Sequence, residues 1–247
     1  MRPILSVCVS AFNRAKLLEL CLKSLLLTEA PRSEWEIVVI DDGSMDETPG
    51  FLAEWWAEQA RIKPHSCHYF RRTLNVGHAN NVGLARNCGL QKSKGEYAAF
   101  VDGDCVFCSD AISRTIAWAK TDKKSFLTSG HWYRVVRTTQ WMLDGLRGLQ
   151  SSVPFGPWFA IRREALVEIG GFDERFVTYG AEDEDIVTRL VRLKYQPMRD
   201  SEIIAVHLWH MMGSNRINEE QRQRQIEWTR NDPSVVRNEN VEWGALS

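Results

Sequence analysis

The sequence has no apolar run that approaches the roughly 20 residues a helix needs to cross a bilayer, so we expect no transmembrane segment. It also has no surplus of either charge, because 31 basic and 32 acidic side chains leave a formal charge of -1. This balance provides no general attraction for nucleic acid, and an anionic ligand must therefore be bound by a local group of side chains. Residues 1–14 alternate in polarity and contain no small-residue cleavage pattern, which predicts a first strand rather than a signal peptide.

Cysteine is infrequent, and its six residues are scattered without the spacing of a disulfide framework. Cys105 and Cys108 form a C-x-x-C, but no second pair lies at the spacing of a zinc ribbon. We interpret them as buried structural thiols, with a zinc or redox site as the alternative. Reduced thiols are typical of a cytosolic protein, and we expect a cytoplasmic location.

The first hundred residues alternate between strand and helix patterns. A short alternating strand at residues 4–10 precedes a helix with apolar residues at helical spacing. The run WEIVVIDD, at 35–42, is largely apolar and ends in two aspartates, as expected of a parallel strand buried on both faces. A second helix at 46–62 and a third unit that ends at EYAAFVD, 96–102, complete the pattern. It predicts an α/β fold with a Rossmann-like, open, mostly parallel sheet and helices on both faces.

The second half of the chain is less regular, and no Gly/Ser linker separates it from the first. We therefore predict a single domain, with a ligand-binding half at about 1–105 and a half at about 106–215 that completes the cleft. Residues 216–247 are rich in charged side chains, and we predict that they form a helical tail with a solvated face. Docking of this tail on an anionic membrane, at its inner face, is the alternative.

Polar residues follow the predicted strands at the points where these end. In open parallel sheets, ligands bind beyond the carboxyl ends of the strands, so one crevice can gather such residues. They are Asn13 and Arg14 after the first strand, Asp41 and Asp42 after the second, and Asp102 and Asp104 after the fourth.

The stretch FVDGDCVF places Asp102 and Asp104 on either side of Gly103 at the end of an apolar run. Past a strand end, a glycine between them allows both carboxylates to converge on one point. Two converging carboxylates repel each other and imply a cation, and oxygen ligands suit Mg²⁺ or Mn²⁺. An Asp-Gly turn whose carboxylates cap backbone amides is the alternative.

Four consecutive acidic residues, 182–185, begin a predicted helix after a glycine-containing loop. Compensation of the helix dipole explains some of them, but four exceed what capping needs. A carboxylate beside a metal-bound phosphate could instead accept a proton from an incoming hydroxyl.

Two histidines, His207 and His210, end a strand-like run near the C-terminus. In a chain that already offers two converging carboxylates, a histidine at a strand end is a candidate third metal ligand. We favour His210 for this role. His207 is either a second nitrogen ligand or a neighbour without a role.

Seven segments follow one another along the chain: SVCVSAFNR, VVIDDGS, ARNCGL, GEYAAFVDGDCVF, GGFDERF, GAEDEDIVTRL and HLWH. In this order they resemble the family 2 glycosyltransferases of the GT-A fold, over about residues 5–210. The C-terminal part is also similar to the galactosyltransferase-type module of β-1,4-galactosyltransferases and of bacterial chondroitin-type polymerases.

The resemblance implies how the donor is held. Residues from Ala11 through Asn13 to Arg14, together with Asp41 and Asp42, would contact the uracil and ribose of a nucleotide-sugar. The resemblance further implies that Arg86 lies near the nucleotide, that Asp102 reaches the ribose or the metal shell, and that Asp104 ligates Mn²⁺ or Mg²⁺.

The same resemblance implies a catalytic side. Glu182 would contact the acceptor or donor sugar, Asp183 would be the general base, and His210 would close the metal shell. The chain departs from the family where it has Tyr179 before Gly180 in place of a tryptophan. Tyr179, or Trp158 with Phe159, could supply the sugar-stacking surface, although an ordinary core position is favoured for Phe159.

The sequence thus predicts a metal-dependent enzyme that transfers a hexosyl or N-acetylhexosaminyl group from a UDP-sugar, with inversion, to a hydroxyl of a glycan, a lipid-linked sugar or a peptide. The alternatives are a retaining transferase on the same fold and a noncatalytic nucleotide-sugar or glycan-binding module. A sugar-phosphate nucleotidyltransferase is disfavoured because SAFNRAK has no glycine-rich basic loop after the first strand.

Overall fold

The fold begins with four parallel strands in the order β3-β2-β1-β4. The computed structural model describes residues 2–62, 66–72, 82–122, 124–134, 147–148, 156–176, 181–210 and 219–245. Every residue of β2 is buried, as its continuous apolar run predicts for a central parallel strand. The four strands are β1 (Leu5–Ala11), β2 (Trp35–Asp41), β3 (Cys67–Arg71) and β4 (Tyr97–Asp102).

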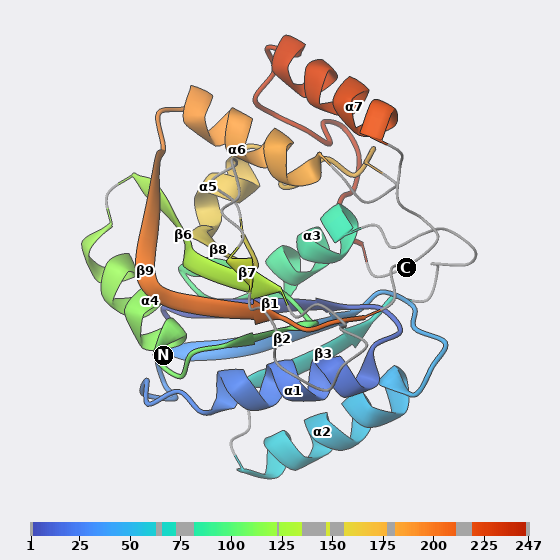
Figure 1. Cartoon of the computed structure of the whole chain (residues 1–247), viewed down its shortest axis with the longest axis vertical. Helices are drawn as coiled ribbons and strands as arrows, with labels where there is room; N and C mark the ends of the chain where they lie inside the picture. The colour runs from blue at the N-terminus through green and yellow to red at the C-terminus, as the bar shows by residue number, and fades with distance from the viewer. Residues whose placement is uncertain are drawn as a thin grey trace.

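Helices cover both faces of the sheet (Figure 1). One buried cluster joins the sheet to α1, α2 and α4, and the opposite cluster joins it to α3, α5 and α6. The fold class predicted from the sequence is confirmed. The helices are α1 (Ala15–Leu26), α2 (Thr48–Ile62), α3 (Val82–Lys92), α4 (Ala111–Thr121), α5 (Arg163–Glu168), α6 (Glu182–Arg192) and α7 (Glu219–Asn231).

Beyond β4 the sheet becomes mixed and curls. It continues through β8, β6 and β9 to β5, with antiparallel pairing except between β6 and β9, and β7 pairs with β6. β5 directly follows β4 in the chain yet pairs with β9 at the other end of this path, so the strands between them must curve around. These strands are β5 (Cys105–Phe107), β6 (Ser125–Arg134), β7 (Arg147–Gly148), β8 (Trp158–Arg162) and β9 (Gln196–His207).

The turn between β4 and β5 is held close to β1. The backbone N–H of Gly103 donates to the carbonyl of Ser10 at 3.1 Å, and a Cβ at Gly103 would lie 2.8 Å from that oxygen. A side chain cannot fit in this gap, so glycine is required. On the other side, β5 is tied to α1, because the N–H of Phe107 donates to the Ser24 hydroxyl at 3.1 Å. The residue between Gly103 and β5, Asp104, is thereby fixed.

The C-terminal residues fold back on the domain. Residues 219–231 form the predicted helix α7, which lies outermost beside α6 in Figure 1. The segment after it does not remain a solvated tail. Arg237 is buried, its backbone N–H donates to Ile169 at 3.0 Å, and its carbonyl fills the space that a side chain at Gly170 would need.

A buried charge network joins this segment to α6. Arg237 pairs with Asp185 at 2.9 Å and with Asp173 at 3.1 Å, and Arg189 also donates to Asp185 at 2.8 Å. All four side chains are at most 1% exposed. Each buried charge therefore has an opposite partner, which offsets the cost of removing it from water.

Two further predictions bear on the fold as a whole. No helix in the described residues has both the length and the apolar character needed to cross a membrane. Cys105 is buried and Cys108 half-buried, and the Cys108 sulfur accepts the Ile204 N–H at 3.3 Å. All six cysteines are free thiols, as expected.

Removing Arg237 tests the importance of the C-terminal segment for stability. Arg237→Ala leaves two buried carboxylates with fewer partners, and we expect the free energy of unfolding to fall by about 3–5 kcal/mol. Urea denaturation measures this loss. Arg224→Ala is the matched control, because its pair with Glu220 is exposed and its removal should change stability by less than about 1 kcal/mol. Equal effects of the two substitutions would contradict the assigned role of Arg237.

Candidate active site

The pairing of β5 with β9 brings Asp104 to the two histidines. Cys105 lies opposite His207 in the antiparallel register, and the N–H of Leu208 donates to the carbonyl of Asp104 at 2.8 Å. The chain then continues from β9 to His210 on the same side. Residues more than a hundred positions apart in the sequence therefore meet at the end of β4.

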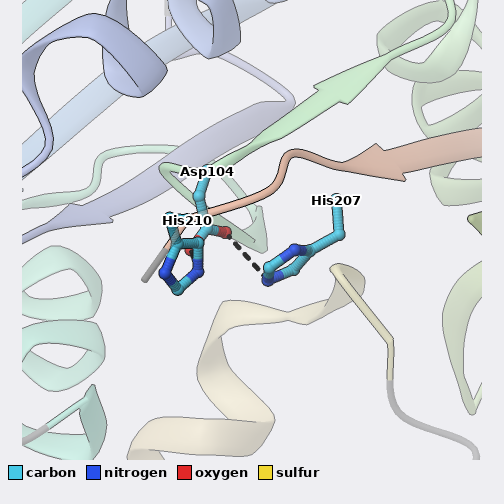
Figure 2. A group of neighbouring side chains, drawn as sticks. All are labelled: Asp104, His207 and His210. Carbon is cyan, nitrogen blue, oxygen red and sulfur yellow. Dashed lines mark ion pairs between the residues drawn. The ribbon is translucent and has the colours of Figure 1, made fainter. Parts of the chain in front are cut away.

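Both imidazole rings turn toward the carboxylate of Asp104 (Figure 2). The Nε2 atom of His210 lies 3.0 Å from Oδ2, and that of His207 lies 3.6 Å from Oδ1. The ring centroids are 5.2 Å apart. The Asp104 side chain is only 5% exposed, so these nitrogens and the nearby Arg14 stabilise its buried charge.

This group fits a divalent cation. One oxygen of Asp104 and one nitrogen of each histidine lie within 4.8 Å of one another. A mixed set of carboxylate oxygen and imidazole nitrogen suits Mn²⁺ better than Mg²⁺, which prefers oxygen ligands and bound water. The carboxylate of Asp102 lies within the same distance of Asp104 and Cys105. Asp104 therefore belongs to both groups of candidate ligands.

Arg14 contacts the same carboxylate. It is the N-cap residue of α1, and its backbone N–H is held by the Thr48 hydroxyl at 3.0 Å. Its guanidinium forms an ion pair with Oδ2 of Asp104 and lies 3.5 Å from Nε2 of His210. The sequence associated Arg14 with the nucleotide, and the structure brings it to the candidate metal group.

A second polar group forms around Arg86 on α3. Its guanidinium donates to Asp183 at 2.6 Å and to Asp102 at 3.3 Å. The Arg86 side chain is 6% exposed, whereas that of Asp183 is 31% exposed and open to solvent. Arg86 therefore holds together two carboxylates that come from different halves of the chain.

The groups around Asp183 act on the pKa of its carboxyl in opposing directions. Burial raises the pKa of this carboxyl above its ordinary value, against the opposing charge of Arg86. The negative charges of Glu182 and Asp102 act in the same direction as burial. A carboxylate with a raised pKa accepts a proton more readily, which is the property that a general base needs.

The four acidic residues at the start of α6 have different surroundings. Ala181, with a φ of 70°, is the N-cap residue, and no side chain caps this end of the helix. Glu182 is buried, and Glu184 pairs with Arg222 on α7. Asp185 belongs to the buried network of Arg189 and Arg237. Helix capping therefore does not explain Asp183, whose carboxylate points to Arg86 instead.

The residues after β1 and β2 form one connected loop structure. Ala11 is paired with Asp41 at the strand ends. Asn13, with a φ of 50°, receives the N–H of Met45 on its side-chain oxygen at 2.7 Å. Asp41 accepts the N–H of Ser44 at 2.9 Å, so its carboxylate closes the turn after β2.

Two arginines at the end of β3 accompany the buried carboxylates of Asp41 and Asp42. The Arg71 Nε atom lies 3.4 Å from Asp41, and Arg72 forms an ion pair with Asp42. Neither arginine was assigned a role from its sequence pattern. Whether Asp41 and Asp42 contact a nucleotide stays a prediction.

A cavity of about 370 Å³ opens beside Arg14 and His210. It lies at the start of α1 and reaches the loop after β2. Its lining residues are Asn13, Arg14, Ala15, Lys16, Leu17, Asp46, Glu47 and His210.

The expected sugar-stacking role was wrong for Trp158, whereas the core position favoured for Phe159 is confirmed. Trp158 and Phe159 are fully buried, and the indole N–H of Trp158 donates to Thr115 at 3.0 Å. Their positions on the central strand β8 give them core contacts on both faces. Tyr179 lies outside the described residues. Trp209, between the two histidines, is 40% exposed.

An α/β sheet of this topology, with acidic residues after β4 and at the start of α6, defines a GT-A type glycosyltransferase fold. The family model described as "Glycosyl transferase family 2" matches residues 6–174. The chain belongs to this family. A model described as "Glycosyltransferase like family 2" matches residues 147–220.

Curated relatives agree with this assignment. The chain is 27% identical over 243 residues to a beta-monoglucosyldiacylglycerol synthase of a Nostoc species, covering 84% of this chain and 47% of the relative. It is 31% identical over 126 residues to a poly(ribitol-phosphate) beta-glucosyltransferase of Bacillus spizizenii, covering 51% of this chain and 18% of the relative. The chain thus spans about half the length of the first of these relatives.

Solved structures show the same fold. S. aureus TarS 1-349, in complex with UDP-GlcNAc, superposes with a TM-score of 0.68 at 20% identity, over 91% of this chain and 65% of that one. The mannosyltransferase PcManGT of Pyrobaculum calidifontis, in complex with GDP-Man and Mn²⁺, gives 0.62 at 22% identity, over 83% and 57%.

The geometry ranks the three candidate metal ligands. Asp104 contacts both imidazoles, so we expect Asp104→Asn to abolish Mn²⁺ binding. Loss of a residue that only orients a metal ligand lowers metal affinity by about 10–100-fold. His210 lies nearer to the Asp104 carboxylate than His207 does and is itself a candidate ligand, so His210→Ala should lower Mn²⁺ affinity by at least about tenfold. His207→Ala should cost less. Calorimetric titration with Mn²⁺ measures all three, and equal losses for the two histidines would make His207 a full ligand.

Proposed function

We propose that this chain is the catalytic domain of a metal-dependent glycosyltransferase, which moves a sugar from a UDP-sugar to an acceptor hydroxyl with inversion. The observation that carries the proposal is the arrangement of two polar groups around the end of β4. Asp104 lies with His207 and His210, while Asp102 lies with Arg86 and Asp183. One group suits a cation and a diphosphate, and the other suits the removal of a proton.

The donor side consists of the strand ends of the first half. We assign the nucleotide to the strand ends that carry Ala11, Asn13, Arg14, Asp41 and Asp42, with Asp102 nearest the ribose. Mn²⁺ or Mg²⁺ held by Asp104, His210 and His207 would neutralise charge that develops on the departing diphosphate. UDP as the nucleotide is supported by the TarS complex with UDP-GlcNAc, whereas PcManGT was solved with GDP-Man.

The acceptor side centres on Asp183. Its carboxylate, partly exposed and held by Arg86, would take the proton of the acceptor hydroxyl as the oxygen attacks the anomeric carbon. Arg86 keeps Asp183 in one position relative to Asp102, and this fixes the direction of attack. Glu182, at the adjacent position on α6, would contact the acceptor or donor sugar. A single displacement of this kind inverts the anomeric configuration.

The domain organisation follows from these assignments. Residues 1–105 form the nucleotide-binding half, 106–215 the half that completes the acceptor and metal site, and 216–247 the C-terminal tail. The proposed likeness of the second half to a galactosyltransferase-type module rests on Glu182, Asp183 and His210. We propose that the transferred group is a hexosyl or N-acetylhexosaminyl group. This agrees with the names of the relatives, one of which is a poly(ribitol-phosphate) beta-glucosyltransferase.

The acceptor remains one of three chemical classes: a glycan, a lipid-linked sugar or a peptide hydroxyl. One relative is named for a diacylglycerol product and another for an undecaprenol-linked glycan, which supports a lipid-linked acceptor. The cytoplasmic location and a peripheral membrane contact through residues 216–247 stay predictions. Arg222 and Arg224 on α7 pair with Glu184 and Glu220, which reduces the positive charge available to anionic lipid.

Asp183→Asn separates binding from chemistry. Asparagine keeps the shape of the side chain but cannot take a proton, so the turnover rate should fall by roughly 10²–10⁴-fold. Affinity for UDP and Mn²⁺ should stay near that of the unchanged protein, because Asp102 still pairs with Arg86. The measurements are turnover of a UDP-sugar on a working acceptor and a parallel titration with UDP.

Glu184→Gln is the matched control on the same helix, because Glu184 faces Arg222 on α7 rather than Arg86. Asp185 cannot serve as the control, since its substitution disturbs the buried arginine network. If Asp183→Asn kept most of the activity, or Glu184→Gln lost as much, Asp183 would not be the base. The anomeric configuration of the product would then decide whether the enzyme is retaining.

A further inference from the structure

Arg14 and a divalent cation would compete for the same carboxylate, that of Asp104. The Arg14 guanidinium forms its ion pair with Oδ2 of Asp104, and this is also the oxygen that lies 3.0 Å from Nε2 of His210. The guanidinium itself lies 3.5 Å from that nitrogen. Arg14 therefore occupies the region between the two strongest candidate metal ligands.

The two cations cannot be there together. A metal–oxygen bond of about 2.0–2.2 Å would place the ion within the contact distance of the guanidinium. The Asp104 side chain is 5% exposed, so solvent screens little of the repulsion between a divalent ion and the arginine charge. Binding of a metal must therefore displace the Arg14 side chain from Asp104.

We propose that Arg14 is a competing cation of the metal site, which exchanges the Asp104 carboxylate for a phosphate of the nucleotide when metal binds. This inference rests on the proposed function, because it requires that Asp104 binds a metal. Arg14 would thereby make metal and nucleotide binding depend on each other. Either ligand alone would bind more weakly than both together.

The surroundings of Arg14 allow the exchange. Its side chain is 23% exposed and lines the cavity of about 370 Å³, so the guanidinium has space to move. Its backbone is fixed independently, by the Thr48 hydroxyl at its N–H and by the N–H of Leu18 at its carbonyl. A guanidinium can bind two oxygens of a phosphate in the same paired geometry in which it binds the two oxygens of a carboxylate. A nucleotide phosphate can therefore replace the Asp104 carboxylate as the partner of Arg14.

A permanent structural ion pair would behave differently. If Arg14 only stabilised the fold around Asp104, its removal would leave a buried carboxylate less well positioned, and metal affinity would fall or stay unchanged. If Arg14 competes with the metal, its removal should instead raise the affinity for the metal in the absence of nucleotide. The two roles are therefore distinguished by the direction of a single measured change.

The experiment compares Mn²⁺ and UDP binding by calorimetry in the unchanged protein and in Arg14→Ala. Without nucleotide, we expect Arg14→Ala to bind Mn²⁺ about tenfold more tightly. This is the change in affinity that corresponds to one charge-assisted hydrogen bond, which Mn²⁺ no longer has to break. With saturating Mn²⁺, the same variant should bind UDP about tenfold more weakly, for the same reason. Arg14→Gln, which keeps more of the side chain without the charge, should change both affinities in the same directions.

Lys16→Ala is the matched control, because Lys16 is an exposed cation on the same cavity. Its Mn²⁺ affinity should change by less than about threefold, since exposed charges are strongly screened. Unchanged or weaker Mn²⁺ binding by both Arg14 variants, while Asp104→Asn abolishes binding, would overturn this inference and leave the proposed function intact. Undiminished Mn²⁺ binding by Asp104→Asn would overturn both.

Discussion

The antiparallel pairing of β5 with β9 is the constraint on which the site depends. β5 follows β4 by a turn of two residues, and β9 arrives about a hundred positions later after the chain has crossed β6 and β8. Their register sets Cys105 opposite His207, and this alone brings Asp104 to the histidines. Because Gly103 lies against the carbonyl of Ser10, the turn cannot relax away from that position. A curled sheet thus converts two short sequence motifs into one cation-binding group.

The second polar group depends on the C-terminal segment through α3. Asn87 follows Arg86 and bonds to Phe172 on both its amide oxygen and nitrogen, while its nitrogen also donates to Glu174. Glu174 in turn accepts the N–H of Gly244, at 2.8 Å. Arg237 anchors the same segment to Asp185 in the first turn of α6, two residues after Asp183. Residues beyond both matched family regions therefore support the elements that carry Arg86 and Asp183.

The features that could be predicted are those that produce a recognisable pattern within a short stretch of the sequence. The apolar run of β2 predicted a buried parallel strand, and the charges after β4 predicted a polar group at the sheet edge. The sequence could not predict the contact of Arg14 with Asp104, because a long flexible side chain leaves no periodic signal of its direction. The docking of Arg237 was equally hidden, since its partners lie in two distant segments. Trp158 was misjudged because an aromatic residue beside a cleft motif has the same sequence pattern as one in the core.

The central claim is that the carboxylate of Asp104 joins metal and nucleotide in one site. It is tested most directly by titrating the unchanged protein with UDP in a calorimeter, once with saturating Mn²⁺ and once with a chelator. The account predicts that Mn²⁺ raises the affinity for UDP by at least about tenfold, since coupling between sites that share a charged group commonly reaches this size. Equal UDP affinity under the two conditions would contradict it.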